Sequence, residues 1–107
     1  MNHSTRVCAL TDLDDDKPLA VEVGDVPVVL VRQGDEVHAL RDECTHAELA
    51  LSDGEMTNKG IECFLHGSCF DLRTGAPSSL PATEPVDVFG VQVVDGDVYV
   101  DAARPIN

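Results

Sequence analysis

Valine is confined to two blocks of this chain. All fifteen valines lie between Val7 and Val37 or between Val86 and Val100, and the stretch from 38 to 85 contains none. The only other β-branched aliphatic residue of that stretch is Ile61. Because β-branched side chains favour strands, we expect a β framework built from the two blocks, with a segment of a different kind inserted between them.

Within the valine-rich blocks, five segments have the pattern of strands. They are LAVEV (19–23), PVVLVRQ (27–33), EVHALRD (36–42), VFGVQVV (88–94) and DVYVD (97–101). The run from Val28 to Val31 is apolar throughout, which predicts burial on both faces. Asp95-Gly96 separates the last two segments and is typical of a two-residue hairpin turn. No helix-length 3.6-residue periodicity is present, so the sequence predicts an all-β fold.

The inserted segment is rich in turn-forming residues. LSDGEMTNKG (51–60) is an example, and Pro77, Pro81 and Pro85 stand where no central strand could continue. Long loops inside a compact domain are usually functional. The chemistry of the chain is therefore expected here.

Two close Cys/His pairs lie in the inserted segment: Cys44 with His46, and Cys63 with His66. Two thiolates and two imidazoles can bind a structural zinc ion, but common zinc sites space paired ligands by two or more residues. One residue separates Cys44 from His46, a gap that suits ligands directed at two neighbouring metals. A [2Fe–2S] rhombus offers this geometry, with both cysteines on one iron and both histidines on the other. A Cys₂His₂ zinc module is the alternative.

The sequence around these pairs resembles the Rieske iron–sulfur pattern. CTH (44–46), a spacer of sixteen residues and CFLHG (63–67) are similar to C-x-H and C-x-x-H-G in that family. LSDG, FDLRTG, LPATEPV and VDGDVYVD also resemble the small bacterial Rieske ferredoxins. The resemblance implies a single Rieske domain over 1–107, an antiparallel β sandwich or barrel-like base with an inserted cluster-binding subdomain of loops and short strands at about 43–82. It also implies one [2Fe–2S] cluster bound by Cys44, His46, Cys63 and His66.

The resemblance also assigns roles around the cluster. His46 and His66 would form the exposed edge through which electrons pass, and Pro81 would lie in a covering loop. Two ferric ions, two sulfides and two thiolates sum to zero charge, whereas four thiolates leave the oxidised cluster at minus two. Adding an electron to the neutral cluster is easier, so Rieske potentials lie at about −150 to +300 mV against about −400 mV for plant-type ferredoxins.

Some positions distinguish branches of the family. Leu49 and Leu65 stand where Rieske proteins of membrane complexes have a disulfide, which favours the soluble, low-potential ferredoxins. Ser68 matches a serine that donates a hydrogen bond to a cluster sulfide in the high-potential branch, where Phe70 is replaced by tyrosine. The sequence leaves open whether Ser68 makes this bond.

The resemblance implies a one-electron carrier between a flavin-dependent reductase and a terminal ring-hydroxylating or related oxygenase. We expect the chain to be no enzyme itself, since it lacks the residues that would hold the mononuclear iron of an oxygenase and shows no acid–base or nucleophile constellation. The alternative within the family is a subunit of a larger redox enzyme, as in nitrite reductases. Those subunits often lack the ligands, whereas this chain has all four.

The formal net charge is −13, from 20 acidic and 7 basic residues. This charge repels phosphate backbones and anionic lipids, which excludes nucleic acid and membranes as partners, and it can steer the chain to a basic protein surface. No apolar run approaches membrane-spanning length and the N-terminus lacks a signal pattern, so we expect a cytoplasmic protein. We also expect it to be a monomer. Cys8, which we expect in a first strand before the five segments named above, and Cys69 are predicted to be buried thiols, and His38 is predicted to be a structural residue.

Overall fold

The computed structural model describes residues 4–43, 50–57, 60–63, 69–77, 84–103 and 105–106. Its strands are β1 (Thr5–Ala9), β2 (Leu19–Val23), β3 (Val26–Gln33), β4 (Glu36–Arg41), β5 (Glu55–Thr57), β6 (Gly60–Glu62), β7 (Cys69–Phe70), β8 (Val88–Val94) and β9 (Asp97–Asp101). The helical elements of this part of the chain are two 3₁₀ turns, η1 (Leu10–Asp12) and η2 (Leu51–Asp53). None of its helices has the length and apolar character needed to cross a membrane. The prediction of an all-β fold is confirmed.

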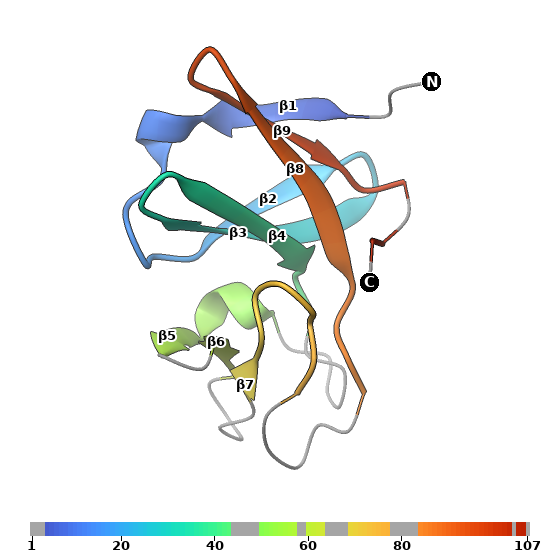
Figure 1. Cartoon of the computed structure of the whole chain (residues 1–107). Helices are drawn as coiled ribbons and strands as arrows, with labels where there is room; N and C mark the ends of the chain where they lie inside the picture. Colours follow the sequence, from blue (N-terminus) through green and yellow to red (C-terminus); the bar gives the residue numbers. More distant parts are fainter. Residues whose placement is uncertain are drawn as a thin grey trace.

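Six strands form one antiparallel sheet in the order β1-β9-β8-β4-β3-β2. Its edge strands β1 and β2 contact each other, so the sheet curls into a nearly closed barrel, the upper part of the molecule in Figure 1. The predicted strand segments at 19–23, 88–94 and 97–101 match β2, β8 and β9 end to end.

Two-residue turns join three of the strand pairs of the barrel. The flanking pairs are Val23↔Val26, Gln33↔Glu36 and Val94↔Asp97. In the third turn Asp95 has φ 52° and Gly96 has φ 80°. Positive φ at both positions is what a type I′ hairpin requires, and it explains why the Asp-Gly dipeptide marks this turn in the sequence.

Strand β3 is buried on both faces, as predicted, because two separate cores lie on its two sides. Val28 and Leu30 belong to the core inside the barrel, whereas Val29 and Val31 belong to a second core. Ala39 and Leu40 of β4 alternate in the same way. One face of β3 and β4 therefore lines the inside of the barrel, and their other face packs against a second, smaller unit.

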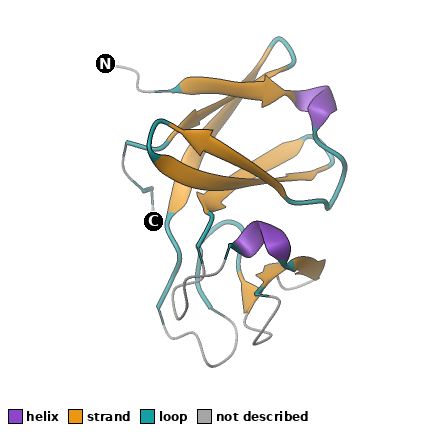
Figure 2. Cartoon of the chain, turned by 180° about the vertical axis from the view of Figure 1, so that it is seen from behind, coloured by secondary structure: helices purple, strands orange, loops and turns teal. Residues whose placement is uncertain are grey.

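That unit lies between β4 and β8 in the sequence and holds η2 and a three-stranded sheet of order β5-β6-β7. It sits at one end of the barrel, whereas η1 lies at the far end (Figure 2). The second core joins it to the barrel; its buried members are Val29, Val31, Leu40, Leu51, Ile61, Cys63, Phe70, Leu72, Val86 and Val88. Burying a large aliphatic or aromatic side chain contributes about 1.5–3 kcal/mol, so this shared core fixes the small sheet on the barrel.

Candidate metal centre

The structure describes one of the four predicted ligands. Cys63 follows β6 directly, and none of its surface is exposed. Cys44, His46 and His66 lie outside the described residues, as do Ser68 and Pro81. Within the described ranges, no group of three or more His, Cys, Asp or Glu side chains is placed to hold a metal ion. The ligand set therefore stays a prediction, and the described residues show what surrounds it.

Cys63 opens the segment that leads from β6 to β7. The two strands pair antiparallel, with Ile61 opposite Phe70 and Glu62 opposite Cys69. This ladder closes the two ends of residues 63–68 on each other. The segment that carries Cys63 and His66 therefore starts and ends at one fixed place in the small sheet.

The side chain of Cys63 lies in the second core, with Leu51, Ile61 and Phe70 among its members. An unpaired charged group in such surroundings is costly. A bound cation supplies the compensating charge, and metal sites draw on thiolates in this way. A buried cysteine at the end of a strand thus fits a metal-bound sulfur, and the thiol-plus-imidazole donor set fits a Rieske cluster.

The other predicted ligand pair, Cys44 and His46, follows β4 in the sequence. The carboxylate of Asp42, just before this pair, is hydrogen-bonded to Ser52, which follows it. Asp42 Oδ1 accepts a hydrogen bond from the Ser52 backbone N–H at 2.7 Å, and Asp42 Oδ2 accepts one from the Ser52 hydroxyl at 2.7 Å. Residues 43–51 lie between these two positions. Sequence reasoning missed this pair, because nothing in the chain pattern joins two polar residues ten positions apart.

Two glycines allow the backbone of the small sheet to pack closely. A Cβ on Gly54 would lie 1.7 Å from the carbonyl oxygen of Glu62, and one on Gly60 would lie 1.9 Å from that of Phe70. Gly60 also has φ +133°, which side-chain-bearing residues rarely adopt. At each glycine, a backbone carbonyl occupies the place that a side chain would need. For Gly54 this is the carbonyl of Glu62, the residue before Cys63, and for Gly60 it is the carbonyl of Phe70, the last residue of β7.

A turn after β7 leads to the segment that carries Pro81. Asp71 Oδ1 accepts hydrogen bonds from the backbone N–H groups of Arg73 at 2.8 Å and Thr74 at 3.0 Å. The bonds from Thr74 and Arg73 hold the pKa of the Asp71 carboxyl below its usual value. On the far side of the segment, Val86 N–H donates to the Gly75 carbonyl at 2.9 Å. This bond joins Gly75 and Val86, the two residues that flank 76–85.

His38 and the two other described cysteines lie apart from this arrangement. The His38 side chain, on β4, is 12% exposed, and its Nε2 lies 3.4 Å from Glu36 Oε2 without the alignment of a hydrogen bond. Burial lowers the pKa of its imidazole. Cys8 and Cys69 are buried, as predicted. The Cys69 thiol lies 3.7 Å from Glu62 Oε2, to which it donates.

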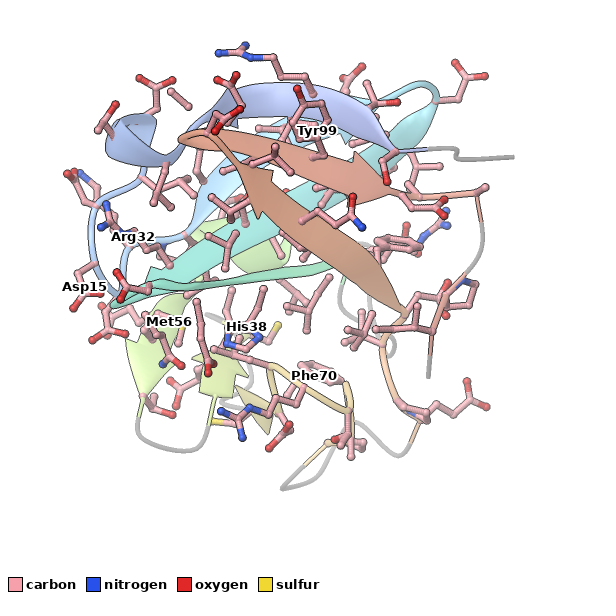
Figure 3. All side chains as sticks on the ribbon, turned by 45° about the horizontal axis from the view of Figure 1, so that its top comes forward. Asp15, Arg32, His38, Met56, Phe70 and Tyr99 are labelled. Carbon is pink, nitrogen blue, oxygen red and sulfur yellow. The ribbon has the colours of Figure 1, made fainter. Side chains whose placement is uncertain are left out.

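Figure 3 shows how these parts lie relative to one another. His38 and Met56 lie where the barrel meets the small sheet, Phe70 lies with the small sheet, and Tyr99 lies toward the far end of the barrel. Met56 packs against the second core, to which Phe70 belongs. Cys63, which directly follows β6, belongs to the same core and so lies at the small-sheet end of the molecule.

Comparison with known proteins agrees with this arrangement. A family model described as "Rieske [2Fe-2S] domain" matches residues 3–90. The anthranilate 1,2-dioxygenase ferredoxin subunit of Burkholderia cepacia is 41% identical over 93 residues, which cover 87% of this chain and 86% of that protein. These matches confirm the resemblance stated above.

Solved structures extend the similarity to the fold. The ferredoxin of carbazole 1,9a-dioxygenase from Nocardioides aromaticivorans IC177 superimposes with a TM-score of 0.88 at 39% identity, covering 92% of this chain and 97% of that one. A structure described as a complex of reduced oxygenase and oxidized ferredoxin in carbazole 1,9a-dioxygenase matches with a TM-score of 0.90 at 37% identity, covering all of both chains. The barrel with its small inserted sheet is therefore shared with ferredoxins of dioxygenase systems.

Proposed function

Because the chain belongs to the Rieske [2Fe-2S] family, we propose that it is a one-electron carrier that delivers electrons to the terminal oxygenase of a ring-hydroxylating or related system. One observation carries this proposal: the similarity to ferredoxin components of dioxygenases runs along almost the whole chain and almost the whole of each relative. One such relative is described in complex with its oxygenase, which supports direct transfer between the two proteins. The chain is then an electron-transfer component, and the chemistry on the organic substrate belongs to the oxygenase.

The proposed site is formed by Cys44, His46, Cys63 and His66, which would hold one [2Fe–2S] cluster. When bound, the cluster supplies a one-electron couple. The chain keeps Cys63 out of solvent and closes both ligand-bearing segments at their ends. We assign electron exit to the two histidines.

The proposal of a one-electron carrier also includes an electron donor, an oligomeric state and a location. The electron donor would be a flavin-dependent reductase, and the carrier would act as a monomer in the cytoplasm. The net charge of −13 supports docking on basic protein surfaces rather than on nucleic acid or lipid.

The metal content and electron transfer of the purified protein test this function. We expect two irons and two acid-labile sulfides per anaerobically purified chain, as the family description implies, and a red-brown colour. The reduced protein should be oxidised on mixing with the oxygenase component of carbazole 1,9a-dioxygenase. Stoichiometric zinc without sulfide would instead establish the zinc module. An intact cluster that oxygenase components leave reduced would favour a role inside a larger redox enzyme.

Ionic strength should control the transfer rate. If the acidic surface guides docking, the second-order rate with the oxygenase falls as salt shortens the Debye length from about 10 Å at 0.1 M to about 3 Å at 1 M. Stopped-flow absorbance measures this rate, and the reduction potential measured over the same salt range is the control, which should change far less. A rate independent of salt would show that the acidic residues play no part in docking.

A further inference from the structure

The two ligand-bearing segments differ in how their ends are closed. Residues 63–68 are bridged by the β6–β7 ladder. The described residues on either side of the first segment, 41–43 and 50–53, share no strand pairing. Something other than a sheet must therefore hold the ends of the segment that carries Cys44 and His46.

The Asp42 carboxylate holds them. Each of its oxygens accepts one hydrogen bond at 2.7 Å from Ser52, one from the backbone N–H and one from the hydroxyl. Both distances are short, as is typical of bonds to a charged acceptor. Asp42 and Ser52 are partly buried, so solvent competes less for these bonds than at an open surface.

Both partners are themselves fixed. The Asp42 N–H donates to the Pro27 carbonyl at 3.0 Å, and the preceding Arg41 N–H donates to the Asp87 carbonyl at 2.8 Å, so this end belongs to the barrel. On the other side, Leu51 next to Ser52 is fully buried in the second core. The carboxylate thus connects the barrel to the η2 turn directly across the mouth of the segment.

We infer that Asp42 is a positioning residue, whose two bonds to Ser52 hold the segment with Cys44 and His46 in the geometry that binds the metal. This inference rests on the proposed function. Without the carboxylate, the Ser52 N–H and hydroxyl lose this acceptor, and the direct connection between the two described ends of the segment is lost. Ligands on a looser segment release metal more easily, because part of the binding free energy then goes into ordering the chain.

Three substitutions separate the carboxylate's contacts from its charge. Asp42→Ala removes both bonds, and Ser52→Ala removes only the bond from the hydroxyl. Asp42→Asn removes the charge but can keep both contacts, since its carbonyl oxygen can accept from the Ser52 N–H and its amide can donate to the hydroxyl oxygen. Asp12→Ala is the matched control, because the Asp12 carboxylate also accepts a backbone N–H, from Ala9 at 3.0 Å, at the far end of the barrel.

The measurements are iron release to a chelator and the electron paramagnetic resonance spectrum of the reduced protein. Loss of groups that orient metal ligands typically weakens metal binding by about 10–100-fold, so Asp42→Ala should release iron about 10–100-fold faster than the parent. Ser52→Ala should show a smaller increase, Asp42→Asn should lie near the parent, and Asp12→Ala should match it. The resonance lines of Asp42→Ala should broaden, because its ligands occupy a wider range of positions.

A purely structural role predicts a different result. The melting temperature of Asp42→Ala would then fall while the release rate and resonance lines stayed those of the parent, and this outcome overturns the inference. If Asp42→Ala does not fold, the iron release rate of Ser52→Ala tests the inference by itself. A Ser52→Ala rate equal to that of the parent then overturns the inference. Failure of the proposed function is distinguishable, since it would appear in the parent protein itself, either as a missing iron–sulfur cluster or as a cluster that oxygenase components leave reduced.

Discussion

Replacing Cys63 by serine is expected to yield a protein without bound iron or inorganic sulfide. Cys63 is fully buried at the end of β6, and in the proposed site it is one of two thiolates on a single iron. A serine hydroxyl stays protonated at neutral pH and is a poor ligand for iron–sulfur clusters, which are held by thiolates. Cys44→Ser should have the same result. Iron and sulfide analysis after anaerobic purification, together with visible absorption, measures the loss.

Cys69→Ser provides the matched control for this loss. Cys69 is also a buried cysteine of the small sheet, but the Rieske pattern gives it no ligand role. Its thiol donates toward Glu62 Oε2, and a serine hydroxyl can donate to the same acceptor. This variant should therefore keep its cluster. Retention of iron and sulfide in Cys63→Ser, with loss in Cys69→Ser, would contradict the proposed ligand set.

The barrel could be predicted from the sequence because its strands are long and their turns have local signals. The both-face burial of Val28 to Val31 follows from an unbroken apolar run, and the Asp95-Gly96 turn follows from the φ values that those residues tolerate. β1 has a weaker pattern, and its pairing with β9 shifts register between Arg6 and Cys8. A bulge of this kind breaks the two-residue alternation on which strand prediction depends.

The small sheet could not be located in the same way. Its strands have two or three residues each, too few for a periodic pattern, and the local sequence favours turns. They form because Ile61 and Phe70 pack on the wall of the barrel, which is a tertiary effect. The sequence resemblance implied short strands in this region without giving their places.

The ligand motif was visible in the sequence, whereas the residues that hold its surroundings were not. Cys63 could be singled out because its spacing from His66 belongs to a known pattern. The bonds between Asp42 and Ser52 depend on how the segment folds back. Gly54 lies in the LSDG stretch that contributes to the resemblance, but the reason for a glycine there becomes clear only with Glu62 beside it.

Gly54→Ala is accordingly expected to disrupt the small sheet. An alanine Cβ would lie 1.7 Å from the Glu62 carbonyl oxygen and 2.9 Å from its carbonyl carbon, both of which are backbone atoms. The backbone angles of Gly54, φ −86° and ψ −167°, are open to any residue, so the clash alone is responsible. Overpacking of this kind typically costs about 1–3 kcal/mol, and here β6 must move away from β5 to relieve it.

Gly54→Ala should also weaken iron binding. Glu62 directly precedes Cys63, so a shift of β6 moves this proposed ligand. Gly90→Ala is the control: Gly90 lies in β8, and among the residues that the structure describes a Cβ there would meet only Ile106 Cγ2, at 3.8 Å, which is an ordinary contact. Thermal unfolding and iron content measure both variants. Gly54→Ala should melt at a lower temperature and hold less iron than the parent, with Gly90→Ala near the parent in both. Equal melting temperature and iron content in the two variants would show that β5 and β6 can separate without cost, and that the small sheet does not position Cys63.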